Sequence, residues 1–294
     1  MKDLLNFSLI NIDKSNSPSA PRESKSSQGA KGSGPTSYSV SEFVRRQLGL
    51  KKTSHMGTLD PKVSGVLPVT LGRACKLAGY FIKHDKTYVG VLETHKEQDI
   101  KKLQELIDDN FIGKIKQTPP HRSAVKVQER ERTVYSWKLI EAGSDGRSFL
   151  FECRVEGGTY IRKLCSDLGE MIGGAHMGEL RRTEAGIFDE STLVNLFDFK
   201  SAVDKYKNGD EEGLKKMLIP AEEAIKKVLP VVEVDKSAIR ALHIGKPLLI
   251  SNVKSKSDVV PGDFFAAFCK GKFIGVYKKT NEASVFARSE FVFN

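Results

Sequence analysis

The residues best suited to chemistry lie in one short segment, HMGTLDPKVSGV, at positions 55–66. It carries one histidine, His55, and one carboxylate, Asp60, with Gly57 and Pro61 bending the chain on either side. A carboxylate on a loop that is fixed by regular elements can serve as a nucleophile or a general base. Asp-Pro is equally common as the start of an ordinary turn. The segment alone therefore leaves Asp60 open between a turn residue and a catalyst.

Two further side chains have both a structural and a chemical interpretation. Tyr88, in KTYVGVLET, is a half-buried packing residue of a strand or a platform that stacks on a base drawn out of an RNA helix. Arg162, in GTYIRKL, is an exposed helical arginine or the cation that keeps a buried carboxylate ionised. The residues alone do not decide between these interpretations.

Basic residues gather at two places in the sequence. The stretch PPHRSAVKVQERER, at 119–132, contains Arg122 and Lys126, and ELRRTE contains Arg181 and Arg182. A charge run is usually a solvated face. Together with a Lys-rich C-terminal region, however, these residues form a candidate RNA-binding track.

The composition supports a polyanionic partner. Lys and Arg number 47 against 37 Asp and Glu, which gives a formal net charge of +10, and an excess of this kind points to nucleic acid. We find no Walker loop, no GxGxxG after a strand, no HExxH and no Cys-x-x-Cys pair, so the sequence predicts neither a cofactor nor a metal site. No secretory h-region and no membrane-length apolar window occurs. We expect an intracellular, cytoplasmic protein with no membrane association.

The surrounding patterns predict an α+β fold. A strand is expected over 7–13, a mobile insertion-like loop over 14–34, and a helix from a Ser39–Glu42 capping box. Further strands and amphipathic helices follow: a strand over 86–94, a helix in EQDIKKLQELIDDNFIG, a hairpin around Ser-Asp-Gly, and a helix in TYIRKLCSDLGEMIGG. Short β-like runs dominate after about residue 228. The sequence thus predicts one domain over 1–228 and a small all-β domain over 229–294.

Several motifs, in the same order, resemble those of the TruB/dyskerin family of RNA pseudouridine synthases. SHMGTLDPKVSGVLPV resembles the family's catalytic motif, KTYVGVLE its second and GGTYIRKLCSDLG its third. QTPPHRSAVK and GAHMGELRRTEAGIF extend the match, and the end of the chain resembles a PUA domain. The resemblance implies a central mixed or antiparallel sheet flanked by helices, with a small β-barrel at the C-terminus.

The resemblance also implies roles for single residues. Asp60 corresponds to the catalytic aspartate, Tyr88 to the base-stacking tyrosine and Arg162 to the arginine that pairs with the aspartate. Leu164 would line the pocket, and His55 would help displace the target nucleotide. The implied reaction converts uridine to pseudouridine and uses no cofactor or metal.

Within the family, GTLDPKV and PPHRSAVK look more like the archaeal and eukaryotic guide-RNA branch than the stand-alone bacterial enzyme. The implied partners are a box H/ACA guide RNA and substrate rRNA or tRNA. Three accessory proteins are also implied: one of zinc-ribbon type, one of glycine-arginine type and one that binds kink-turns. A stand-alone tRNA synthase and a catalytically dead RNA-binding scaffold are the alternatives.

The sequence departs from the family pattern at two places. The family usually reads Asp-Lys-Pro-x-Gly-Pro-Thr-Ser near its start, but here the insertion-like tract separates Lys14 from the Gly-Pro-Thr-Ser at 34–37. Ser54 and Met56 flank His55 where smaller residues, often glycine, are usual. The first departure is expected to form a loop that projects from the fold, and the second concerns the pose of His55.

Overall fold

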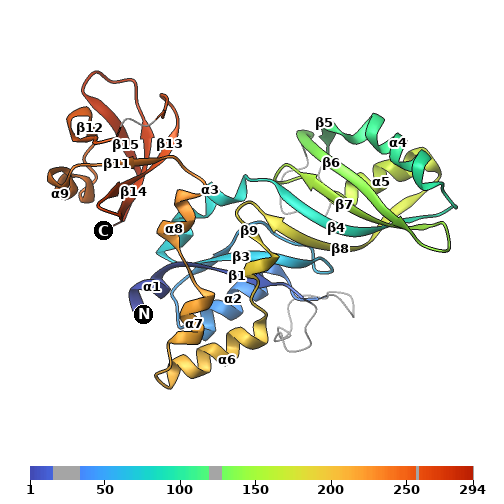
Figure 1. Cartoon of the computed structure of the whole chain (residues 1–294), viewed down its shortest axis with the longest axis horizontal. Coiled ribbons are helices and arrows are strands. Elements are labelled where there is room, and N and C mark those ends of the chain that lie inside the picture. Colours follow the sequence, from blue (N-terminus) through green and yellow to red (C-terminus); the bar gives the residue numbers. More distant parts are fainter. Residues whose placement is uncertain (16–33, 119–127, 256–257, 294) are drawn as a thin grey trace.

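The computed structural model describes residues 1–15, 34–118, 128–255 and 258–293 (Figure 1). Within these residues the chain forms two β-sheets, with helices packed around the larger one, which confirms the predicted α+β class. Most of the expected insertion and the basic stretch with Arg122 and Lys126 lie outside the described residues.

The larger sheet supplies the frame of the molecule. Its strands within the described residues are β1 (Phe7–Asp13), β2 (Thr53–His55), β3 (Ser64–Gly72), β4 (Lys86–Thr94), β5 (Gly113–Gln117), β6 (Arg130–Ala142), β7 (Ser148–Val155), β8 (Ala175–Ala185), β9 (Phe188–Asp189) and β10 (Ile219–Pro220). They run in the order β10-β1-β3-β8-β4-β7-β6-β5, with β2 beside β3 and β9 beside β8. The pairs are antiparallel except β3 and β8, which run parallel where Gly65 lies opposite Arg182. Segments far apart in sequence therefore meet at the start of β3.

Helices cover the sheet in two groups (Figure 1). In the described part of the chain they are α1 (Lys2–Asn6), α2 (Ser37–Gln47), α3 (Ala78–Ile82), α4 (Ile100–Phe111), α5 (Ile161–Ile172), α6 (Leu196–Lys207), α7 (Glu212–Met217), α8 (Ala221–Lys226) and α9 (Ile239–His243). The helices α4 and α5 pack on β6 and β8, whereas α2, α6 and α7 lie by β1 and β3. The apolar stripe of α5 explains this, because Ile161, Leu164 and Leu168 all face the core.

The second sheet contains β11 (Val231–Glu233), β12 (Leu248–Leu249), β13 (Phe264–Cys269), β14 (Lys272–Lys279) and β15 (Val285–Val292), in the order β11-β13-β14-β15-β12. It packs on the first sheet through aromatic rings. The Phe7 ring of β1 stacks on Phe273 at 5.6 Å and on Phe293 at 4.1 Å. Residues of both sheets therefore pack in one apolar cluster.

The start of α2 differs from the sequence-based expectation. The helix begins at Ser37, and the Thr36 hydroxyl, not that of Ser39, caps it by accepting from the Ser39 backbone N–H at 3.0 Å. Glu42 pairs with Arg45 and Arg46 and does not reach back to the cap. The predicted capping box is wrong because the helix starts earlier: with Thr36 as the cap, the third helical position is Ser39, and Glu42 lies too far along the helix to reach back.

Two features of the described residues concern membranes and metals. No helix there is both long enough and apolar enough to cross a membrane. The same residues contain no cluster of three or more His, Cys, Asp or Glu side chains that could hold a metal ion.

Candidate active site

The loop between β2 and β3 presents Asp60 to solvent. The Asp60 carbonyl accepts a hydrogen bond from the Val63 N–H at 2.9 Å, which closes a tight turn. The neighbouring Leu59 and Val63 side chains are buried in the main core, while the Asp60 side chain keeps 48% of its surface exposed. The turn and the exposed carboxylate are thus one feature, because buried neighbours on both sides hold Asp60 outward.

Arg162 is the partner of Asp60. Its Nη2 donates to Asp60 Oδ2, although 102 residues separate the two in sequence. Arg162 stands in the first turn of α5, and Gln117 of β5 holds the chain just before that turn. The Gln117 side chain accepts from the Tyr160 N–H at 3.0 Å and donates to the Tyr160 carbonyl at 3.2 Å. The ion pair therefore joins two supported segments and fixes which way the carboxylate faces.

The N-terminal part of the chain holds the Asp60 loop by its main chain. Lys14, only 1% exposed, donates from Nζ to the carbonyls of Asp60 at 2.9 Å, Pro61 at 2.9 Å and Val63 at 2.6 Å. The Ser37 hydroxyl accepts from the Leu59 N–H at 2.8 Å. The two pieces that the insertion separates in sequence thus meet at the same loop.

Burial lowers the pKa of Lys14. Desolvation lowers the pKa of its amine from 10.5 to about 8, while Asp60 acts to raise it and Arg182 to lower it further. The sequence contained only a weak signal for this residue, a lysine directly after an apolar strand.

Arg182 does not fit the predicted RNA track. It is 1% exposed, and it donates to the carbonyl of Val66 at 2.8 Å and to that of Gly57 at 3.1 Å. A guanidinium with this burial cannot reach a phosphate, so the prediction of an RNA contact at Arg182 is corrected. Its neighbour Arg181 remains partly exposed and pairs with Asp13 and Glu190.

Tyr88 and Leu164 lie beneath the loop. Tyr88 is 8% exposed and stands in β4 directly opposite Arg182 of β8. Leu164 of α5 is completely buried, and both residues belong to the core cluster that also contains Leu59. The structure therefore brings the predicted tyrosine and leucine into the core that supports the Asp60 loop.

His55 ends β2 and points back to the loop. One of its ring nitrogens, Nε2, lies 3.1 Å from the Thr58 hydroxyl. Burial lowers the pKa of His55, and the nearby Arg182 charge lowers it further, so the neutral imidazole is favoured at neutral pH. Met56 is buried in the second apolar cluster. The side chain of Met56 thus packs in the core, while the His55 ring faces Thr58.

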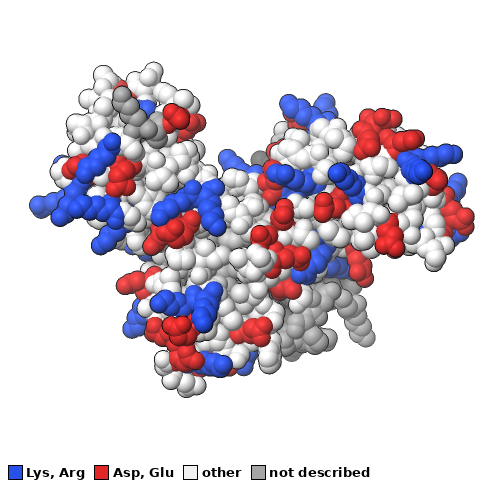
Figure 2. All heavy atoms as spheres, viewed as in Figure 1, with Lys and Arg blue, Asp and Glu red and all other residues white. Residues whose placement is uncertain are grey.

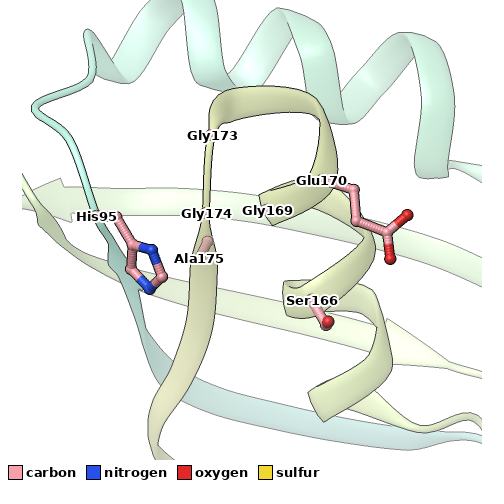
Figure 3. A pocket seen from close by; sticks show the side chains of 7 residues that line it. All are labelled: His95, Ser166, Gly169, Glu170, Gly173, Gly174 and Ala175. Atoms are coloured by element: carbon pink, nitrogen blue, oxygen red, sulfur yellow. The ribbon is translucent and has the colours of Figure 1, made fainter.

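Two hollows accompany this site. One, of about 520 Å³, begins at Lys62 in the loop and Ser64 at the start of β3, and extends over parts of β4 and β8. The other, of about 320 Å³, lies at the far end of α5 between His95, Ser166 and Glu170 (Figure 3). Asp60, Tyr88 and Arg162 line neither hollow; the first adjoins the loop through Lys62 and Ser64, and the second lies away from it.

Comparisons with known proteins match this arrangement to one family. Residues 45–161 match the model of the TruB family pseudouridylate synthase N-terminal domain, and residues 162–226 match the tRNA pseudouridylate synthase B C-terminal domain. "Probable tRNA pseudouridine synthase B" of Methanothermobacter thermautotrophicus is 41% identical over 87% of this chain and 78% of its own length. The chain belongs to the TruB family of pseudouridine synthases. It is an RNA pseudouridine synthase, and hence an isomerase.

A second relative of this synthase, with the same name and from Korarchaeum cryptofilum, is 44% identical over 83% of this chain and 75% of its own length. Among solved structures, a Cbf5-Nop10-Gar1 complex contains a chain with a TM-score of 0.85 and 34% identity, covering 100% of this chain and 87% of that one. A chain of an H/ACA RNP bound to substrate RNA containing 2′-deoxyuridine has a TM-score of 0.83 and 32% identity. The match covers 100% of this chain and 87% of that one. These likenesses extend to the second sheet.

Proposed function

We propose that this synthase isomerises uridine in RNA with Asp60 as its catalytic carboxylate. The reaction breaks the bond between C1′ and N1, turns the uracil and forms a bond between C1′ and C5. The proton lost from C5 is balanced by one gained at N1, so no redox cofactor is consumed. The ion pair of Asp60 with Arg162 on an anchored, solvent-facing loop carries this proposal.

The geometry suits a flipped nucleotide. A base inside a helix is out of reach, so the target uridine leaves the stack before it reacts. Asp60 would then meet the sugar, either as a nucleophile at C1′ or as a base on a sugar proton, and both roles need an ionised carboxylate. Arg162 would orient that carboxylate. Tyr88 would stack on the uracil, with Leu164 in the pocket wall and His55 beside the path of the displaced nucleotide.

The substitution Asp60→Asn tests the assignment. It keeps the size of the side chain but removes the charge, so we expect a loss of about 10³-fold or more in single-turnover rate, with RNA affinity nearly unchanged. Release of tritium from RNA that contains 5-tritiated uridine measures the rate. Asp109→Asn, on the exposed face of α4, is a matched control. Full activity in Asp60→Asn would remove Asp60 from the reaction and assign the chemistry to another group, whereas an inactive parent chain would point to a dead scaffold.

We further propose that a box H/ACA guide RNA selects the target uridine and that accessory proteins complete the particle. The motif wording and the likeness to chains of Cbf5-Nop10-Gar1 and H/ACA particles over the whole length support this. The purified chain would then modify a target only when guide RNA and accessory proteins are added. Sequencing of RNA that copurifies with the chain would recover H/ACA guides.

The stand-alone alternative has support of its own, because the curated relatives are named as tRNA pseudouridine synthases. Under this alternative the purified chain alone would convert a uridine of a tRNA transcript. Mapping of pseudouridine in that transcript, with and without the guide particle, separates the two proposals. Conversion without guide RNA would favour the stand-alone enzyme.

The second sheet is proposed to be a PUA domain over residues 229–294 that grips RNA beside a catalytic domain over residues 1–228. It begins with β11 at Val231 and carries exposed lysines on β14. Figure 2 includes Lys and Arg side chains over this part of the molecule, interspersed with Asp and Glu. An RNA ligand would dock by phosphate contacts, which makes its affinity sensitive to salt.

A further inference from the structure

Arg182 joins the two ends of the catalytic loop. Its Nε donates to the carbonyl of Val66, where β3 has begun, and its Nη2 donates to the carbonyl of Gly57, where the loop leaves β2. One rigid, planar guanidinium therefore fixes the separation of both ends, with Asp60 between them. Arginine suits this role because its donors sit on separate nitrogens of one rigid plane, whereas the donors of a lysine all radiate from a single nitrogen.

The same side chain reaches the proposed base platform. Tyr88 lies directly across the β4–β8 ladder from Arg182. Residues opposite each other on paired strands project to the same face of the sheet, so the phenol lies on the side of the guanidinium. Burial lowers the pKa of Arg182, and hydrogen bonding and charge from Tyr88 oppose this. Arg182 thus contacts both the loop that carries Asp60 and the tyrosine that would stack on the uracil.

The loop is shaped around Arg182. A Cβ atom at Gly57 would lie 3.2 Å from Arg182 Nη1, and one at Gly65 would lie 2.1 Å from the Arg182 carbonyl oxygen. Both glycines have positive φ, 91° and 98°. Gly57 therefore makes room for the Arg182 side chain, and Gly65 makes room for the main chain of β8 at the same residue.

A purely structural role would not favour an arginine here. Lys14 and Lys86 are also buried, and the Arg182 charge lowers the pKa of both. None of the ion pairs found among the described residues includes Arg182. A buried cation without a carboxylate costs stability, and an apolar residue of similar size is often equal or better for the fold. The charge and the planar set of donors of Arg182 are best explained by the loop carbonyls that the guanidinium binds.

We propose that Arg182 is a positioning residue of the isomerisation, which sets the Asp60 loop and Tyr88 in register for the flipped uridine. This rests on the proposed function of Asp60 and Tyr88. Arg182 touches no substrate, so it acts through the two groups that it holds. Its loss lowers the rate of the chemical step and leaves RNA affinity nearly unchanged.

The test compares three variants of the full chain in its active form. Arg182→Met keeps most of the side-chain volume and removes the guanidinium. Arg182→Lys keeps the charge but loses the planar set of donors. Lys86→Met is the matched control. Lys86 is a buried cation of the same cluster, but it donates to the carbonyls of Ile82 and His84, outside the loop. Thermal unfolding, RNA affinity and single-turnover rate at saturating enzyme are measured for each.

Misplacement of a reacting group by about 1 Å costs about 10²-fold in rate, so we expect Arg182→Met to lose about 100-fold in rate with affinity within about three-fold of the parent. Arg182→Lys should lose about 10-fold or more, and Lys86→Met should keep its rate. Amide exchange over residues 57–66 should quicken in both Arg182 variants.

A rate for Arg182→Met within about three-fold of the parent overturns the proposal. If that variant does not fold, Arg182→Lys decides alone, and an unchanged rate there overturns it equally. Asp60→Asn is assayed beside these variants. Activity in Asp60→Asn would refute the proposed function, whereas an inactive Asp60→Asn with a fully active Arg182 variant would refute only the inference about Arg182.

Discussion

Two regions of the synthase hold cations in opposite ways. Beneath the Asp60 loop, Lys14, Lys86 and Arg182 are buried and donate to main-chain carbonyls. On the C-terminal sheet, Lys272 and Lys278 of β14 are exposed to solvent. Buried cations fix a backbone, whereas exposed ones offer charge to a ligand. The net charge of +10 therefore includes buried cations that bind main-chain carbonyls and exposed cations that are free to attract a ligand.

The difference extends to two glycines of positive φ. Gly65 and Gly262 have almost the same backbone angle, φ 98° and 99°, one beside the buried cations and one in the turn before β13. A Cβ atom at Gly65 meets the Arg182 backbone, whereas one at Gly262 meets nothing within 4 Å. The first region is packed around its charges, and the second is open.

The largest effect is therefore expected for Gly65→Ala. Strain at positive φ and overlap with the Arg182 carbonyl together should cost about 3 to 5 kcal/mol of unfolding free energy. Activity should fall with it, because the Gly65 main chain also bonds to Lys14 in both directions. Denaturant unfolding measures the loss.

Gly262→Ala is the matched control, since it carries the same backbone strain without the overlap. We expect a cost of about 1 to 2 kcal/mol there. Equal losses in the two variants would mean that the close approach at Gly65 is relieved by a small shift and that the loop is less tightly held than we infer.

The contrast also explains what the sequence could predict. Periodicity and turn residues predicted β1, β4, α5 and an all-β C-terminal domain, because apolar patterns report which face is buried, whereas the central sheet followed from the resemblance. The position of Asp60 and its pairing with Arg162 followed from motif resemblance. No pattern distinguished Arg181 from Arg182, because adjacent residues of a strand face opposite sides and the burial of each side depends on the distant β3 and β4. The role of Lys14 depends on a loop that lies 46 residues further along the chain.

The second expected effect concerns pH and Lys14. Its pKa is about 8 in the folded chain against 10.5 for an exposed lysine, so between these values the unfolded state binds more protons. Stability contributed at this site should therefore rise as pH increases from about 8 to about 10.5. The expected gain is about 1 to 3 kcal/mol, the lower value allowing for partial solvent access.

Comparison with Lys14→Met isolates this gain, because all other titrating groups are shared by the two chains. Urea unfolding at several pH values gives the difference in unfolding free energy, which should shift in favour of the parent chain as pH rises. A difference that stays constant across the range would show that Lys14 keeps its proton, held by the three carbonyls that it binds.

The smallest effect is expected on the open side of the comparison. Changing Lys272 and Lys278 to Gln together should weaken RNA binding by about three- to ten-fold at moderate salt, and should lower the salt slope of binding by about 1 to 2. The single-turnover rate at saturating enzyme should stay unchanged, because neither lysine contacts the Asp60 loop. Lys205→Gln with Lys207→Gln on α6 removes the same charge elsewhere and should leave the slope nearly unaltered. Equal salt slopes for the two double variants would mean that the C-terminal sheet attracts RNA only through the net charge of the protein. The lysines of β14 would then have no specific role in RNA binding.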